Sequence, residues 1–289
     1  MAKLRIGISG WRYPPWRGSF YPSDLPQRLE LHYASRALSS IEINGSFYAL
    51  QPPASWRKWY ADTPRGFVFS VKAPRFITHV RRLRDVEKPV ANFFASGLLE
   101  LREKLGPILW QFPPSFAYDP ELFDTFLSML PRDSASALAL ARRHDDHIKH
   151  VGDLSLGKNR RLRHVIEIRH ESFEDPAFIK LLRKHRVGLV VADAARKWPK
   201  LEDVTAGFVY MRLHGEKELY ASGYTDAALD DWAKRIRAWM RGSQSRDASH
   251  RISRELPPRR KSRDVYCYFD NDIKVKAPFD AMKLRSRLR

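Results

Sequence analysis

The sequence predicts a single (β/α)₈ TIM barrel, an α/β fold in which eight parallel strands alternate with helices. The chain length of 289 residues suits one such domain, and 43% hydrophobic residues suffice for one large core. Short apolar runs alternate with amphipathic helical patterns along the whole chain. After the first run, Gly7-Ile-Ser-Gly10-Trp11 lacks the third glycine of a dinucleotide-binding fingerprint, so an open doubly wound sheet is not expected.

Apolar runs mark the expected strands, at residues 4–10, 40–47, 67–73, 107–113, 164–170, 187–194, 208–215 and 265–272. The clearest helical patterns lie between them, at residues 25–38, 54–61, 95–105, 120–130, 175–185 and 226–241. Strands that alternate with helices form parallel βαβ units, and eight such units close into a barrel. No composition change suggests a second domain, so residues 1–289 are expected to form one unit.

A formal net charge of +19 makes nucleic acid and anionic small molecules plausible partners, because such a surface attracts polyanions. A solvated arginine-rich surface without a specific partner explains the charge equally well. Much of it lies in two basic insertions, residues 149–163 before the fifth strand and 241–263 before the eighth. The second also contains Ser, Gly and Pro throughout, and is expected to be mobile.

No contact with a membrane is expected, because the chain has no run of eighteen apolar residues. The amino-terminal residues enter a strand at once and do not resemble a signal peptide. The single cysteine, Cys267, cannot form an internal disulfide. These features predict a cytoplasmic protein.

Polar residues recur with one parity in several of the expected strands, and the apolar residues take the other. Charges beneath the helices would be costly, so the polar set should face the barrel axis. The set falls near the carboxyl ends of the strands, where TIM barrels carry their active sites. A buried polar network that only fills the barrel is the alternative. The inward polar residues are expected to be Glu42, Asn44, Lys72, Gln111, Glu167, Arg169, Asp193, Arg212 and His214.

Motifs on these strands and the following loops occur in a defined order: Gly7-Ile-Ser-Gly-Trp11, Phe20-Tyr-Pro22, Glu42-Ile-Asn44, Phe69-Ser-Val-Lys-Ala-Pro74, Thr78-His79, Gln111-Phe-Pro-Pro114, Glu167-Ile-Arg-His170, Tyr210-Met-Arg-Leu-His-Gly215 and Tyr268-Phe-Asp-Asn-Asp272. Together they resemble the YecE-like family, the domain of unknown function numbered 72, over nearly the whole chain. The resemblance implies a TIM barrel and supplies no settled activity.

The chain departs from the family pattern at two places. Ile8 stands where the family often has threonine, which costs a hydroxyl near the site. Asp270 and Asn271 stand where the family often has two asparagines, which adds a carboxylate.

The expected site combines the carboxylates of Glu42 and Glu167 with four basic side chains. Such a site suits an anionic ligand held by Arg and Lys, with a carboxylate or His214 moving a proton. We therefore predict an enzyme that acts on a phosphate-containing substrate, by phosphoester or phosphodiester hydrolysis, with Glu42, Glu167 and His214 catalytic and no cofactor. The predicted substrate-binding residues are Trp11, Asn44, Lys72, Gln111, Arg169, Asp193, Arg212 and Asn271.

Three alternatives remain open. A metal-dependent hydrolase would hold a divalent ion with Glu42, Glu167, Asp193 and His214, although the neighbouring Lys and Arg would repel the ion. A glycosidase would use the paired carboxylates, with Trp11, Tyr13 and Trp16 stacked on sugars. A non-catalytic nucleic-acid-binding barrel would use the loops after the first and third strands, which interleave aromatic and basic residues. The inward carboxylates favour an enzyme, because a binding module needs none.

Overall fold

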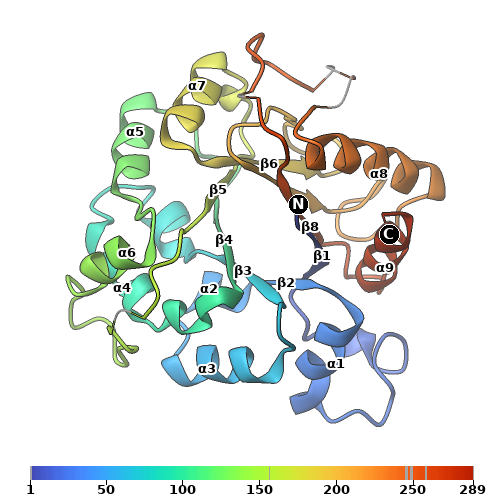
Figure 1. Cartoon of the computed structure of the whole chain (residues 1–289), viewed down its shortest axis with the longest axis horizontal. Helices are drawn as coiled ribbons and strands as arrows, with labels where there is room; N and C mark the ends of the chain where they lie inside the picture. The colour runs from blue at the N-terminus through green and yellow to red at the C-terminus, as the bar shows by residue number, and fades with distance from the viewer. Residues whose placement is uncertain (1, 156, 245–246, 248–249, 258, 289) are drawn as a thin grey trace.

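The computed structural model describes residues 2–155, 157–244, 247, 250–257 and 259–288 (Figure 1). Within them, eight parallel strands pair in chain order and close into a barrel, which confirms the predicted (β/α)₈ fold. The strands are β1 (Leu4–Ser9), β2 (Ser40–Ile43), β3 (Val68–Lys72), β4 (Leu105–Gln111), β5 (His164–Glu167), β6 (Gly188–Asp193), β7 (Phe208–Leu213) and β8 (Asp264–Phe269).

Helices surround the barrel in the view of Figure 1. Several begin at side chains that accept a hydrogen bond from a free backbone N–H of the first turn, namely Asp119, Asp133, Asp175 and Thr225. The helices are α1 (Glu30–Ala37), α2 (Gly45–Tyr48), α3 (Pro53–Asp62), α4 (Glu87–Ala95), α5 (Pro120–Met129), α6 (Ser134–Ala141), α7 (Pro176–His185), α8 (Asp226–Met240) and α9 (Ala277–Arg287).

The helix predicted at residues 95–105 is wrong. Helix α4 ends at Ala95, and Gly97 then turns the chain with a φ of 101°. The apolar residues that follow form the short 3₁₀ stretch η4 (Leu98–Lys104), in which Arg102 has a φ of 49°. The sequence did not reveal α6, because its residues are apolar or small on every side and show no amphipathic period.

Residues 194–207, which connect β6 to β7 and are all described, form no helix. The described part of the basic insertion 241–263 lies against this connection. The backbone N–H groups of Ile252 and Ser253 donate to the Asp203 carboxylate, at 3.0 and 3.1 Å. Residues 245, 246, 248, 249 and 258 lie outside the described residues, so the mobility of the insertion stays a prediction.

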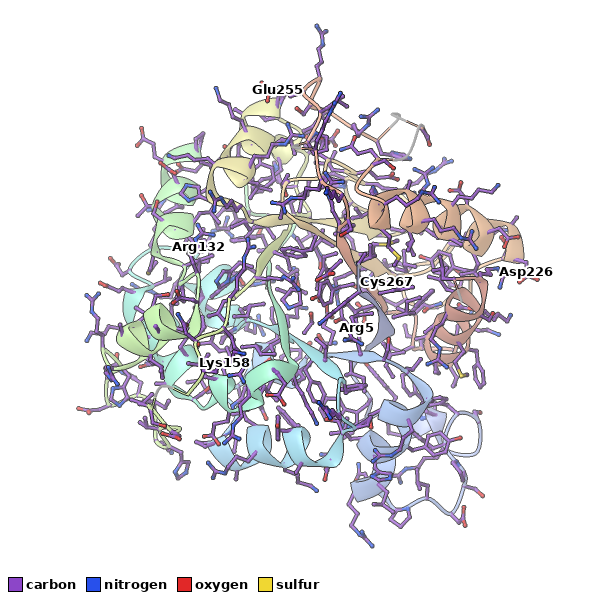
Figure 2. All side chains as sticks on the ribbon, in the orientation of Figure 1. Arg5, Arg132, Lys158, Asp226, Glu255 and Cys267 are labelled. Carbon is purple, nitrogen blue, oxygen red and sulfur yellow. The ribbon has the colours of Figure 1, made fainter. Side chains whose placement is uncertain are left out.

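The core has two layers. The larger one fills the space between strands and helices and includes the buried, unpaired Cys267. Figure 2 shows Cys267 within the outline of the molecule and the charged side chains of Asp226 and Glu255 at its edge. The second layer lies inside the barrel: Leu109, Val165, Val190, Ala192, Phe208, Tyr210, Tyr266 and Tyr268. No helix among the described residues is long and apolar enough to cross a membrane.

The closure of the barrel depends on Gly7. It pairs with Ser40 across β1 and β2, and a Cβ at this position would lie 1.8 Å from the Ser40 carbonyl oxygen. Real side chains cannot approach a backbone oxygen so closely. Only glycine therefore allows the two strands to keep their present spacing.

We expect Gly7→Ala to lower the melting temperature by at least about 5 °C, since overpacking costs about 1–3 kcal/mol or more. The control is Gly157→Ala, where no atom lies within 4 Å of the new Cβ. Thermal unfolding followed by circular dichroism measures both. Equal melting temperatures for the two variants would contradict the assigned close approach.

Candidate active site

At the carboxyl end of the barrel interior, the guanidinium group of Arg212 binds three carboxylates. The side chain is 1% exposed. Its Nη2 atom lies 2.9 Å from Oε1 of Glu42 and 2.8 Å from Oδ2 of Asp270, and its Nη1 atom lies 2.7 Å from Oε2 of Glu167. A single cation therefore holds two carboxylates from the strands β2 and β5 and a third from the residue that follows β8.

Strand register explains why these residues meet. Arg212 pairs with Ala192 on one side and Tyr268 on the other, and both of those residues belong to the layer inside the barrel. Adjacent residues in a parallel register point to the same face of the sheet. Glu167 shares its register with Gln111, and Glu42 shares its register with Ser9. All of these side chains therefore point inward.

Further buried groups complete this network. Both Ser9 Oγ and Tyr210 Oη donate to the Glu42 carboxylate, each at 2.5 Å. Arg169 contacts Oε1 of Glu167 at 2.8 Å. His214 Nδ1 lies 3.0 Å from Oδ2 of Asp270. We call Glu42, Glu167, Arg212 and Asp270 with these partners the Arg212 network.

The charges of the network shift the pKa values of its members. Burial alone would raise the pKa of the Glu167 carboxyl, but the positive charges of Arg212 and Arg169 outweigh it and lower this pKa well below its ordinary value. Burial also opposes ionisation of Asp270, yet Arg212 and His214 lower its pKa to about 2. Burial and the charge of Arg212 lower the pKa of His214. The network therefore contains ionised carboxylates and a neutral imidazole near neutral pH.

A cavity of about 660 Å³ opens above the network at the mouth of the barrel. Five of the predicted site residues line it: Asn44, Lys72, Gln111, Arg169 and Arg212. Its wall also contains side chains outside the predicted catalytic and substrate-binding sets, namely Tyr13, Phe47, Tyr48, Arg75, His79, Tyr220, Asp270, Asp272 and Ile273. Most of these residues lie in loops, where strand parity gives no information. Only their presence in the ordered motifs, such as Thr78-His79, could have pointed to them.

The three predicted catalytic residues do not line this cavity. Glu42, Glu167 and His214 are each 0% exposed and lie beneath it. Glu42 and Glu167 contact Arg212, and His214 contacts Asp270. Their position suits them to hold Arg212 and Asp270 in place.

Two predicted substrate-binding residues point away from the mouth. Asp193 pairs with Leu213, whose side chain is in the outer core layer, and Asp193 lines a separate cavity with Trp198 and Lys200. Asn271 has the outward parity of Phe269, and its side chain donates to Ser222 and Asp280. At the end of β8, the residue with the inward parity is Asp270.

Trp11 also does not line the cavity. It is 8% exposed and makes an edge contact with Trp59, with the ring centroids 5.5 Å apart. A third aromatic ring, Phe69, lies beneath it at 6.5 Å. Its role in this structure is to close the top of the apolar core.

The cavity has a basic side and an acidic side. Lys72 ends β3, Arg75 and His79 lie in the turn after it, and Arg169 follows β5. Asp270 and Asp272 follow β8, which is separated from β3 by β1 and β2. Burial and the neighbouring charge of Asp270 raise the pKa of Asp272 to about 6, so its carboxyl exchanges a proton near neutral pH.

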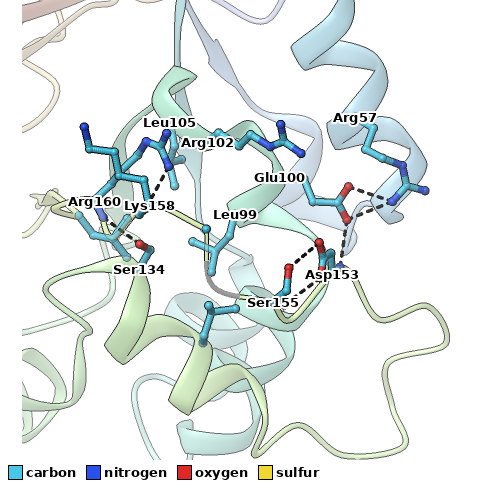
Figure 3. A pocket seen from close by; sticks show the side chains of 13 residues that line it. Arg57, Leu99, Glu100, Arg102, Leu105, Ser134, Asp153, Ser155, Lys158 and Arg160 are labelled. Carbon is cyan, nitrogen blue, oxygen red and sulfur yellow. Dashed lines mark hydrogen bonds and ion pairs between the residues drawn. The ribbon is translucent and has the colours of Figure 1, made fainter.

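A second cavity, of about 540 Å³, lies near the start of β4 and is drawn in Figure 3. Two of its four cationic side chains form ion pairs with the protein itself. Arg57 binds Glu100 at 2.9 Å, and Arg160 lies 3.6 Å from Glu103. The amino end of TIM-barrel strands serves stability rather than chemistry, so we assign the active site to the mouth.

The residues proposed from the sequence as metal ligands are not arranged as a ligand set. Glu42 and Glu167 face the guanidinium of Arg212, and Asp193 lies in another cavity. In the part of the chain that the structure describes, no group of three or more His, Cys, Asp or Glu side chains is positioned to hold a metal ion.

The fold and the cavity define a TIM-barrel protein with a polar, charged cavity at the carboxyl ends of its strands. The family model described as "Protein of unknown function DUF72" matches residues 5–289, so the chain belongs to this family. This confirms the resemblance that the sequence motifs indicated.

Two curated relatives are similar to part of the chain. The chain is 33% identical over 118 residues to "UPF0759 protein YunF" of Bacillus subtilis and 27% identical over 113 residues to "UPF0759 protein YecE" of Escherichia coli K12. Each alignment covers 39% of this chain, and it spans 41% and 39% of those relatives' lengths.

Solved structures of the family share the fold. A DUF72 family protein from Thermotoga maritima superposes with a TM-score of 0.73 at 21% identity, over 99% of both chains. A second one, from Enterococcus faecalis, has a TM-score of 0.67 at 18% identity and covers 99% of this chain and 95% of that chain.

We expect Arg212→Met to cost about 3–5 kcal/mol of stability at pH 8, because it leaves several buried carboxylates without their cation. Those carboxyls then gain raised pKa values, so the loss should shrink between pH 8 and pH 5 as they become protonated. The wild type should keep the contribution of these carboxylates to stability between pH 8 and pH 5. Its Glu167 and Asp270 have lowered pKa values, so their contribution is present above about pH 4 and is lost as the pH falls further.

Chemical denaturation at both pH values measures this, with Arg57→Met as the control. Arg57 forms an exposed ion pair with Glu100, and its loss should cost less than about 1 kcal/mol at either pH. An equally small, pH-independent loss for Arg212→Met would show that Arg212 does not hold the network together.

Proposed function

We propose that this protein is an enzyme that binds a small anionic substrate, bearing a phosphate or carboxylate group, in the cavity at the mouth of the barrel. One observation carries the proposal: Lys72, Arg75 and Arg169 line the cavity with unused donors. Among the described residues, neither Lys72 Nζ nor Arg75 forms a hydrogen bond or ion pair. Arg169 contacts the Glu167 carboxylate through Nε and Nη2, which leaves its Nη1 group unused.

We assign anion binding to Arg75 and Arg169 instead of Arg212. Arg212 donates to Glu42, Glu167, Asp270 and Ser9, so it cannot offer a free fork to a ligand. The planar group of Arg169 is fixed by stacking on Trp198, 3.7 Å from the ring centroid. A fixed guanidinium with a free donor is suited to oxygen atoms of phosphate or carboxylate.

Asp272 supports an enzyme rather than a simple binding protein. Its pKa of about 6 allows the carboxyl to give and take a proton near neutral pH. It lies on the acidic side of the cavity, across from the cations that would hold the anionic group. The buried carboxylates chosen from the sequence would act indirectly, by holding Arg212. Phosphate esters therefore form the first substrate class to test, with Asp272 in place of Glu42 and Glu167 as the acid–base group.

A single-stranded nucleic acid is the second candidate ligand. Large apolar side chains are exposed at the rim, with Tyr48 at 73% and Phe76 at 49%, next to Arg75 and Arg81. Bases stack on such aromatic rings while basic side chains contact the backbone. A longer ligand would then extend from the cavity across this rim.

We expect inorganic phosphate and a small phosphomonoester to bind the wild type, and Arg75→Ala to weaken this binding by roughly 10- to 100-fold. This is the scale of about 1.5–3 kcal/mol for a hydrogen bond to a charged group. Arg75 makes no bond to the described protein, so its loss reports ligand contact rather than altered structure. Isothermal titration calorimetry measures the affinities, and Arg169→Ala should act in the same direction.

Arg57→Ala, at the opposite end of the barrel, is the matched control and should bind phosphate like the wild type. Two results would contradict the proposal: no phosphate binding by the wild type, or equal binding by the Arg75→Ala and wild-type proteins. A single-stranded oligonucleotide that binds tightly while phosphate monoesters do not would favour the second candidate.

A further inference from the structure

Lys72 differs from the other buried cations of the molecule. It is only 9% exposed, yet its amine has no hydrogen bond and no ion pair among the described residues. Lys104 is buried to a similar degree, at 5% exposed, and its amine donates to Tyr60 O, Thr63 O and Thr63 Oγ1 at 2.6–3.0 Å. Buried amines normally have such partners, because an unpaired buried charge is costly. The amine of a largely buried side chain that faces the cavity without a protein partner therefore indicates a functional role.

The Arg212 network does not supply a carboxylate partner for this amine. Glu42 and Glu167, the carboxylates on neighbouring inward positions, are bound by Arg212 and Arg169. The amine instead lies over the ring of Phe47, 4.0 Å from its centroid, and faces the cavity. Burial and the positive charge of Arg212 lower the pKa of Lys72 to about 8. At pH 8 about half of the amine is then neutral, against less than about 1% for an ordinary lysine.

We propose that Lys72 is a nucleophile that forms an imine with the carbonyl group of an anionic aldehyde or ketone bound in the cavity. The inference rests on the proposed function for the anionic group, which Arg75 and Arg169 would hold. It places the reaction at a carbonyl group of the substrate rather than at a phosphoester bond. The cavity of about 660 Å³ accommodates a small molecule that carries both groups.

The step is balanced without an oxidant or a reductant. The lone pair of Lys72 Nζ forms a bond to the carbonyl carbon, and the oxygen takes the π electrons. The two protons of the neutral amine leave with that oxygen as water, so that a C=N bond replaces the C=O bond. Asp272, which lines the same cavity, would lend a proton to the departing oxygen and regain one from the nitrogen.

Charged groups from several elements face the amine and set its reactivity. They are Glu42 on β2, Arg75 and His79 after β3, Glu167 on β5, Arg169 after β5, Arg212 on β7 and Asp270 after β8. Burial and the charge of Lys72 lower the pKa of His79 to about 4, so His79 is neutral over the pH range of the test. The pKa values of Glu167 and Asp270 lie below their ordinary values, so these two carboxylates stay ionised there. The labelling rate should therefore follow the amine itself.

The test traps the imine on the full chain. Glyceraldehyde 3-phosphate at limiting concentration is incubated with the protein at pH 8 and sodium cyanoborohydride, and the adduct is located by peptide mass spectrometry. We expect labelling of Lys72 at least about 10-fold above any other lysine, with a rate that rises through about pH 8 and then levels. Lys72→Arg and Lys72→Met should both remove this adduct, whereas Lys180→Arg, at an exposed site, should not.

Uncharged glyceraldehyde separates the two proposals. We expect it to label Lys72 about 10-fold more slowly than the phosphate ester. Equal rates would overturn the anionic substrate class while leaving the nucleophile in place. Phosphate binding by calorimetry without any Lys72 adduct would overturn the imine alone. Adducts spread evenly over exposed lysines, or a Lys72 rate that still rises at pH 10, would also overturn it, and mapping on the wild type decides this even if a Lys72 variant fails to fold.

Discussion

The ion cluster around Arg212 determines how the rest of the mouth is organised. Three carboxylates meet inside a barrel whose interior excludes water, where mutual repulsion between like charges is strong. One guanidinium has enough donors, in a fixed plane, to bind all of them. This arrangement requires the inward parity of β2, β5, β7 and β8 to bring the groups to one level. The cluster is therefore a consequence of barrel closure as much as of the residues themselves.

The network divides the predicted site into two levels with different functions. The lower level is the Arg212 network, in which the buried carboxylates pair with Arg212 and Arg169. The upper level lines the cavity and contains groups that the network does not use, including Lys72, Arg75 and Asp272. We propose that ligand chemistry takes place at this upper level, because its donors and protons are free to meet a substrate among the described residues. The two levels are linked at Lys72, because burial and the charge of Arg212 together lower the pKa of its amine.

Sequence alone predicted the barrel and its strands, and it selected five residues that line one cavity, because each of these depends on periodicity and on the parity of adjacent residues. The same parity rule was not followed consistently at the ends of β6 and β8, and this produced two wrong predictions. Asp193 and Asn271 have the outward parity of Leu213 and Phe269, and consistent alternation would have selected Asp270 instead. The loop residues Arg75, His79 and Asp272 have no parity, so periodicity could not place them. The sequence also could not predict the ion pairs, because the choice of carboxylates that Arg212 binds depends on distances across the barrel.

The central claim is that the Arg212 network occupies the nearby carboxylates and leaves the amine of Lys72 without a counterion. The most direct measurement is an NMR titration of the protein with ¹³C-labelled lysine side chains, in which the Lys72 signal is assigned by its loss in Lys72→Arg. The account predicts a titration midpoint near pH 8 for this one lysine. A midpoint at or above about 10.4, the ordinary value for lysine, would mean that a carboxylate pairs with Lys72 and would contradict the account.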